Sequence, residues 1–212
     1  MLLQEEREQV AEYGRAMVRR GLTNGTFGNV SVYNEAEGLF AVSPSGMDYF
    51  SITPADVAVL TLDGKQLDGG KPSSETELHR VLYRNRPGIC AAVHTHSRFA
   101  TLLSCLGWTI PPLHYLIAYA GREVRCTPYV PFGTPELAQA ALAALGEERA
   151  CLLGNHGLLA CGPDAGFAMD TAEQTEFCAE LYYRARLAGQ PRLLTEDELT
   201  HAMQAVLAYR RT

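Results

Sequence analysis

The sequence lacks a long apolar segment, a paired-cysteine motif and a block of basic residues. No stretch approaches the roughly 18 consecutive apolar residues of a membrane-spanning helix, and the first twenty residues mix charges throughout, unlike a signal peptide. The six cysteines are scattered without a CxxC pair, as expected of reduced core thiols. The net charge of −6 without a basic run disfavours a nucleic-acid partner. We therefore expect a cytoplasmic protein that binds neither membranes nor nucleic acid.

The length and composition are those of an ordinary globular chain. The 212 residues fit one domain, and the apolar fraction of 47% with a charged fraction of 20% is typical of such domains. A core of this size needs neither disulfides nor a structural metal to fold. We expect residues 1–212 to form a single domain, in which any metal site would serve chemistry.

Turn and capping signals divide the chain into alternating helices and strands. Pro87-Gly88 ends one predicted helix, and Thr134 with Pro135 begins another. Ser97 is the expected N-cap of a helix that follows a short apolar strand. The order predicts a mixed α and β fold in packed layers. Helices are predicted up to Gly21 and over residues 74–86, 97–107, 135–145, 164–188 and 196–209, and strands are predicted around residues 30–32, in 38–62, in 89–96, over 123–130 and on both sides of 155–157.

Two histidines lie two residues apart in a predicted strand. Strand side chains alternate between faces, so His94 and His96 project from the same side. Neighbouring imidazoles on one face can share a divalent ion, and imidazole suits zinc. Coincidence or core packing explains this pair equally well when it is taken alone.

A third histidine, His156, lies in an Asn-His-Gly turn between two apolar strands. Three histidines with one open position match a catalytic zinc site, whereas a closed, cysteine-rich set would indicate a structural one. A solvated turn histidine is the simpler interpretation of this residue by itself. His79, His114 and His201 are not expected to be ligands, because His79 lies inside a predicted helix and nothing pairs with the other two.

Glu75 follows Pro-Ser-Ser at a predicted helix start. An acidic residue in a first helical turn interacts favourably with the helix dipole, which is a purely structural explanation. A carboxylate there could also bind a metal or act as a general acid and base. The sequence alone leaves both interpretations open.

Three small polar loops could hold a phosphate group. Glycine lets backbone N–H groups approach an anion, and a helix N-terminus adds a favourable dipole. Each loop is equally consistent with a plain turn or cap, and none matches a P-loop or a dinucleotide fingerprint. The loops are 25–29, Ser45-Gly46 and Ser73-Ser74.

Six motifs occur along the chain in a fixed order: GTFGNVSV near the start, PSSE at 72–75, HTHS at 94–97, IPPLHY at 110–115, FGTPEL at 132–137 and NHGLLACG at 155–162. This order resembles the class II aldolase and adducin family, most closely its L-fuculose-phosphate aldolase members, and the resemblance covers nearly the whole chain. It implies an α/β fold with a central, mostly antiparallel sheet covered by helices, and a homotetramer with active sites at subunit interfaces.

The resemblance also assigns roles to individual residues. It implies one zinc ion per chain, bound by His94, His96 and His156, with Glu75 as a displaceable fourth ligand and the catalytic acid and base. Tyr115 is expected to reach a neighbouring subunit's site as a proton donor. The expected phosphate ligands are Asn29, Ser45, Gly46, Ser73 and Ser74, with Phe132 expected close to Tyr115, and Tyr209 matching a C-terminal tyrosine of the nearest relatives.

The implied reaction is zinc-dependent retro-aldol cleavage of a ketose 1-phosphate to dihydroxyacetone phosphate and an aldehyde. The sugar would resemble L-fuculose 1-phosphate or a 5-deoxypentulose 1-phosphate. Pentulose-phosphate 4-epimerases and methylthioribulose-phosphate dehydratases of the same superfamily are alternatives, which the segment 110–115 disfavours. The sequence departs from the family pattern in two places. Asn155 stands where the nearest relatives often carry histidine, and the tail 209–212 is short, which leaves the identity of the aldehyde product open.

Overall fold

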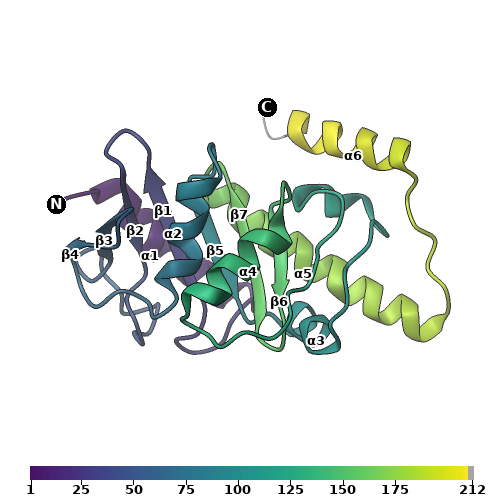
Figure 1. Cartoon of the computed structure of the whole chain (residues 1–212), viewed down its shortest axis with the longest axis horizontal. Helices are drawn as coiled ribbons and strands as arrows, with labels where there is room; N and C mark the ends of the chain where they lie inside the picture. Colours follow the sequence, from purple (N-terminus) through teal and green to yellow (C-terminus); the bar gives the residue numbers. More distant parts are fainter. Residues whose placement is uncertain (210–212) are drawn as a thin grey trace.

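A seven-stranded sheet runs through the middle of the molecule (Figure 1). The computed structural model describes residues 1–209; the tail residues 210–212 lie outside that part. The strand order is β4-β3-β2-β1-β5-β7-β6, and every neighbouring pair is antiparallel. The sheet therefore agrees with the expected antiparallel architecture. The strands are β1 (Asn29–Asn34), β2 (Leu39–Val42), β3 (Ala58–Thr61), β4 (Gln66–Asp68), β5 (Ala91–Thr95), β6 (Ala150–Leu153) and β7 (Gly157–Gly162).

Helices cover both faces of the sheet. On one face, α1 (Gln4–Arg19) and α5 (Ala165–Ala188) pack on the strands, while α2 (Thr76–Asn85) and α4 (Pro135–Leu145) pack together over the other. Two apolar clusters result, and β7 contributes Leu158 to one and Leu159 to the other. Strands buried on both faces are apolar throughout, which explains why β5 to β7 show no polar alternation.

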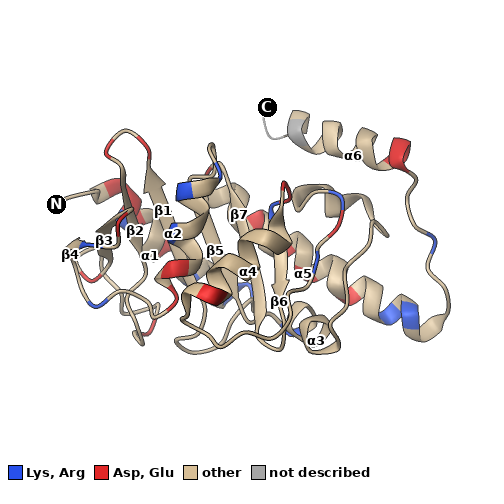
Figure 2. Cartoon of the chain, in the orientation of Figure 1, with Lys and Arg blue, Asp and Glu red and all other residues tan. Residues whose placement is uncertain are grey.

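Two further helices lie at the periphery. Helix α3 (Arg98–Leu106) follows β5 directly and packs on α5, whereas α6 (Glu196–Tyr209) packs on the 3₁₀ helix η1 (Tyr115–Tyr119), away from the sheet (Figure 1). A capping box begins α6, since Thr195 and Glu198 exchange backbone-to-side-chain hydrogen bonds of 2.8 and 3.3 Å. Lys and Arg are distributed over several elements, including α5 and the segment before α6 (Figure 2). Within residues 1–209, no helix combines the length and apolar character needed to span a bilayer.

The predicted strand over residues 123–130 is wrong. This segment forms only two isolated bridges, one of Val124 with Ile110 and one of Cys126 with Leu152 of β6. The hydrogen bonds to β6 stop after Thr127, and Pro128 has no N–H to continue them. The segment therefore runs along the sheet edge without becoming an eighth strand.

Candidate metal centre and substrate pocket

Three histidines converge at one end of the sheet. His94 is in β5 and His96 follows its last residue, and their Nε2 atoms lie 3.0 Å apart. His156 reaches the same point from the turn between β6 and β7. The three ring centroids are 4.8, 4.9 and 5.1 Å apart, with interplanar angles of 72° or 73°. The rings thus surround a common point in a nearly threefold arrangement.

Glu75 completes this cluster. The first residue of α2, Thr76, lies two residues after the predicted helix start. Glu75 occupies the N-cap position of α2, and its side chain makes no capping hydrogen bond. Instead, Oε2 lies 3.2 Å from His94 Nε2 and Oε1 lies 3.3 Å from His156 Nε2. The carboxylate therefore points toward the histidines and not toward the N–H groups at the start of α2. The interpretation of Glu75 as a plain first-turn residue is wrong.

The donor set fits a divalent cation. Ligand atoms of Glu75, His94, His96 and His156 all lie within 4.8 Å of one another. Tetrahedral nitrogen and oxygen ligands at zinc distances are separated by about 3.3 Å, close to the spacings seen here. Glu75 Oε1 and His156 Nδ1 are buried without a hydrogen-bond partner, and an oxygen in that position is stabilised by a positive charge.

The His94 ring is held in one orientation by the backbone. Its Nδ1 lies 2.9 Å from the carbonyl oxygen of Leu158 on the neighbouring strand β7. A carbonyl accepts, so Nδ1 carries the proton and Nε2 keeps its lone pair toward the cluster. This is the usual arrangement behind a metal-binding imidazole.

The cluster favours neutral imidazoles and an ionised carboxylate. Burial, with a smaller contribution from the neighbouring His94, lowers the pKa of both His96 and His156 to about 4. Burial opposes ionisation of Glu75, but His94, His156 and the Asn29 amide outweigh it and hold the Glu75 pKa at about 2. Unprotonated nitrogens and an ionised oxygen are the forms that bind a metal.

The cluster opens into a cavity of about 390 Å³. On one side are two loops that backbone hydrogen bonds hold together, from Ser73 N to Ser43 O at 3.1 Å and from Ser45 N to Lys71 O at 2.9 Å. Four residues predicted to bind phosphate line this side, namely Ser45, Gly46, Ser73 and Ser74. No Lys or Arg is among the described residues that line the cavity. An anion here would depend on N–H groups, hydroxyls and the N-terminus of α2.

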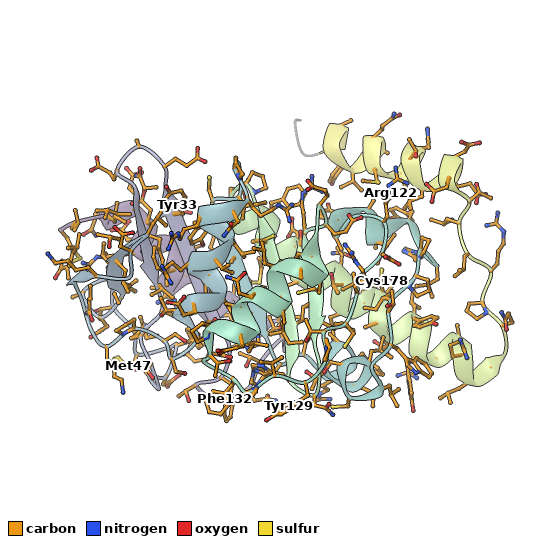
Figure 3. The ribbon with its side chains drawn as sticks, in the orientation of Figure 1. Tyr33, Met47, Arg122, Tyr129, Phe132 and Cys178 are labelled. Carbon is orange, nitrogen blue, oxygen red and sulfur yellow. The ribbon has the colours of Figure 1, made fainter. Side chains whose placement is uncertain are left out.

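Aromatic and aliphatic side chains form another part of the cavity wall. Tyr129 and Phe132 lie beside each other at the lower edge of the molecule in Figure 3, and Val130 joins them in the lining. Phe27 stacks on His96, with centroids 5.7 Å apart at 25°. Sequence reasoning found Phe132 but missed Phe27 and Tyr129, because nothing in the local sequence distinguishes them from other exposed aromatic residues.

Asn29 is the fifth predicted phosphate ligand, and it also lines the cavity. Its side chain is buried, and Nδ2 donates to Glu75 Oε2 over 3.1 Å. The preceding Gly28 has φ of 73°, and a Cβ there would meet the His94 carbonyl oxygen at 2.6 Å. Glycine is therefore required for β1 to bring Asn29 against β5.

Tyr115 and Tyr209 lie away from this cavity. Together they line a separate hollow of about 430 Å³ between η1 and α6, with Leu116 and Val206. Tyr115 is 55% exposed. Within one chain the structure therefore brings neither tyrosine to the histidine cluster, and Phe132 lies in the cavity without Tyr115.

The chain is similar to proteins of known function over almost its full length. The family model described as the class II aldolase and adducin N-terminal domain matches residues 8–183. A 5-deoxy-D-ribulose 1-phosphate aldolase of Bacillus thuringiensis serovar kurstaki is 48% identical over 99% of both chains. An L-fuculose phosphate aldolase of Escherichia coli K12 is 35% identical over 95% of this chain and 94% of its own.

A solved structure has the same fold. An L-fuculose 1-phosphate aldolase superposes with a TM-score of 0.94 at 37% identity, covering 97% of this chain and 98% of its own. This similarity includes the seven-stranded antiparallel sheet and its helices, and so confirms the expected α/β architecture.

Proposed function

The chain belongs to the class II aldolase and adducin family, and we propose that it is a zinc-dependent aldolase that cleaves a 5-deoxypentulose 1-phosphate to dihydroxyacetone phosphate and an aldehyde. The observation that carries this proposal is the cluster of Glu75, His94, His96 and His156 at the wall of a cavity with one polar and one apolar side. Residues 1–212 would form one cytoplasmic domain.

Zinc is the proposed metal, because three imidazoles and one carboxylate without a thiolate match a catalytic zinc site. When bound, the cation supplies a Lewis acid that stabilises the negative charge developing on the ketone oxygen. His94, His96 and His156 would hold it, and Glu75 would be the ligand that gives way to substrate.

Glu75 is the proposed acid and base. Its pKa of about 2 keeps it ionised at neutral pH, so it can accept a proton. Cleavage would pass the proton of the substrate hydroxyl through Tyr115 of a neighbouring subunit to solvent, break the adjacent carbon–carbon bond and leave the electron pair on the dihydroxyacetone phosphate fragment. Glu75 would deliver to that carbon a proton that it has taken up from solvent.

The polar side of the cavity is the proposed phosphate site. Ser45, Gly46, Ser73 and Ser74 present hydroxyl and N–H groups there, close to the start of α2. The second hydrogen of the Asn29 amide, which Glu75 does not use, is a further donor. Fixing the phosphate would orient the sugar carbons toward Glu75.

The apolar side supports the choice of sugar. Phe27, Tyr129, Val130 and Phe132 suit a terminal methyl group better than a hydroxyl, because an apolar wall leaves a hydroxyl unpaired. The Bacillus thuringiensis relative is named for 5-deoxyribulose 1-phosphate, which ends in such a methyl group. A methylthio end would fit the same wall.

We further propose a homotetramer. Tyr115 and Tyr209 are well exposed and lie outside the cavity of their own chain. In an assembly with sites between subunits, Tyr115 would donate or accept the proton of the aldehyde oxygen in a neighbouring site, and Tyr209 would lie beside it.

The test measures dihydroxyacetone phosphate released from 5-deoxyribulose, methylthioribulose, L-fuculose and L-rhamnulose 1-phosphates, with and without chelator, alongside the metal content. We expect fastest cleavage of the 5-deoxy sugar, lost on chelation and restored by zinc. His96→Ala should lose metal and activity together, while His201→Ala, in exposed α6, should keep both. A metal-loaded protein that cleaves none of the four sugars but epimerises a pentulose 5-phosphate, or dehydrates methylthioribulose 1-phosphate, would overturn the proposal.

A further inference from the structure

A chain of buried polar side chains lies beneath Glu75, between α2 and β1. Asn29 and His79 are hydrogen bonded through Oδ1 and Nε2. His79 Nδ1 lies 2.6 Å from Ser31 Oγ, which is itself hydrogen bonded to the hydroxyl of Tyr83. His79 and Ser31 are completely buried. This series of hydrogen bonds leads from Tyr83 through the side chains of Ser31, His79 and Asn29 to the Glu75 carboxylate.

The register of the sheet produces this arrangement. Asn29 pairs with His94 across β1 and β5, and Ser31 pairs with Ala92 two residues further on. Directly opposed and alternate residues share one face, so the two polar side chains of β1 and the metal-side His94 all point toward α2. His79 lies one helical turn after Glu75 and therefore faces the same strands.

The chemistry of the groups fixes the direction of every hydrogen bond. An ionised carboxylate only accepts, so Asn29 presents its NH₂ group to Glu75 and its carbonyl oxygen to His79. That oxygen also only accepts, so His79 carries its proton on Nε2. Nδ1 must then accept from the Ser31 hydroxyl, and Ser31 in turn accepts from Tyr83. All the donors in the chain point toward Glu75.

A neutral His79 ring carries a single N–H proton, on either Nδ1 or Nε2. Complete burial, with a smaller contribution from His94 and against the opposing effect of Glu75, lowers the His79 pKa to about 3. The ring is therefore neutral at physiological pH, and only one of its nitrogens can donate. If Nδ1 carried the proton, the Asn29 amide would lose its partner and could turn its oxygen toward the carboxylate.

We propose that His79 is a positioning residue for Glu75, because its Nε2–H tautomer locks the Asn29 amide with NH₂ directed at the carboxylate. The proposal rests on the role of Glu75 in the proposed function. Locked in this way, Asn29 holds Oε2 in place and leaves Oε1 directed at His156. His79 touches neither substrate nor metal and acts through Asn29.

The surroundings distinguish this role from packing. Leu78 and Leu82, next to His79 on α2, belong to an apolar core cluster, and the ring of Tyr83 belongs to the same cluster. An apolar residue would fill such a position without the cost of burying an imidazole. The histidine is tolerated because both its nitrogens are hydrogen bonded, and its partner Asn29 in turn donates to the Glu75 carboxylate.

The test compares His79→Gln, whose amide can still donate from the Nε2 position, with His79→Leu, which cannot. Loss of an outer-shell partner typically costs about 10–100-fold in activity or metal affinity. We expect that loss in kcat for His79→Leu, with a smaller rise in KM because Asn29 is also a proposed phosphate donor, and recovery of most of the wild-type kcat for His79→Gln. Leu82→Val is the matched control, since Leu82 is fully buried on the same helix and its side chain carries no hydrogen-bonding group. It should lower the melting temperature and keep kcat.

Two further measurements do not depend on activity. Nitrogen-15 NMR of the metal-free, histidine-labelled protein should show His79 protonated at Nε2 and bare at Nδ1, and zinc titration should show weaker binding by His79→Leu. The opposite tautomer would refute the inference. So would full kcat in His79→Leu, a His79→Gln as impaired as His79→Leu, or an equal kcat loss in Leu82→Val. If the wild type cleaves no ketose 1-phosphate, the proposed function fails, while the tautomer and zinc affinity still test the role of His79.

Discussion

Glu176 of α5 replaces a missing helix cap next to the metal cluster. Its two carboxylate oxygens accept from the backbone N–H groups of Phe99 and Ala100, each over 2.8 Å. Ser97 is at the N-cap position of α3 as predicted, but its side chain makes no capping hydrogen bond. Because α3 begins two residues after His96, Glu176 also anchors the end of the segment that presents this histidine.

The cost of removing this carboxylate follows from the two hydrogen bonds. In Glu176→Gln, the amide oxygen can accept from one N–H group, while the NH₂ group opposes the other. A hydrogen bond to a charged group contributes about 1.5–3 kcal/mol, and loss of the charge at a helix N-terminus removes about 0.3–1 kcal/mol more. We therefore expect a loss of about 2–4 kcal/mol in the free energy of unfolding. At about 2–4 °C per kcal/mol for a chain of this size, the melting temperature should fall by roughly 4–16 °C.

Glu173→Gln is the matched control, with the same charge change three residues earlier on the same helix. Glu173 forms a surface ion pair with Arg20 at 2.7 Å, with 42% and 39% of the side chains exposed. Such a pair contributes about 0–1 kcal/mol. Urea unfolding and calorimetry of the two variants measure the difference, and zinc competition should show about 10-fold weaker binding only for Glu176→Gln. Equal effects of the two substitutions would show that Glu176 does not anchor α3.

Three further predictions concern the cluster itself. Removing the metal should lower the melting temperature, and added zinc should raise it again. The free energy of unfolding should increase with the logarithm of the zinc concentration, by about 2.7 kcal/mol at 100 times Kd. A melting temperature independent of zinc would contradict a bound cation. Glu75→Gln should retain zinc by elemental analysis yet lose about 10²–10⁴-fold in kcat, and an unchanged kcat would rule out its acid and base role. Gly157→Ala should lower the free energy of unfolding, measured in urea, by about 1–3 kcal/mol. The added Cβ would clash with the Thr95 carbonyl oxygen and lie 3.1 Å from His96 Cδ2. An unchanged free energy of unfolding would show that the backbone around this turn shifts to make room for the methyl group.

Local signals predicted most of the secondary structure. Pro135 at the first helical position and the Thr134 side chain, which accepts from Leu137 N over 3.2 Å, place the start of α4 where the sequence indicates. The strand over residues 123–130 failed because its apolar composition says nothing about available partners. Strand formation there depends on the neighbouring edge strand β6 and on Pro128, both of which limit the ladder.

The histidines show how far the same reasoning reaches into the site. Spacing predicted that His94 and His96 share a face, because a period of two is a property of the strand itself. His156 joins them only because β7 pairs with β5, bringing its turn to the end of that strand. No local pattern encodes that pairing, so the turn indicated His156 only as a candidate, and the family resemblance alone placed it with His94 and His96.

His79 is the residue for which the local argument gave an incomplete account. A histidine inside a helix was not expected to bind metal, and His79 lies outside the four-residue cluster. Its contacts with Asn29 and Ser31 depend on β1 lying beneath α2, which is a tertiary feature. A buried imidazole with both nitrogens paired, one turn from Glu75, has a stronger explanation as part of the carboxylate's support than as core filling. The polar residues of β1 therefore connect the substrate cavity with the buried support of Glu75, since Asn29 lines the cavity and is also hydrogen bonded to His79.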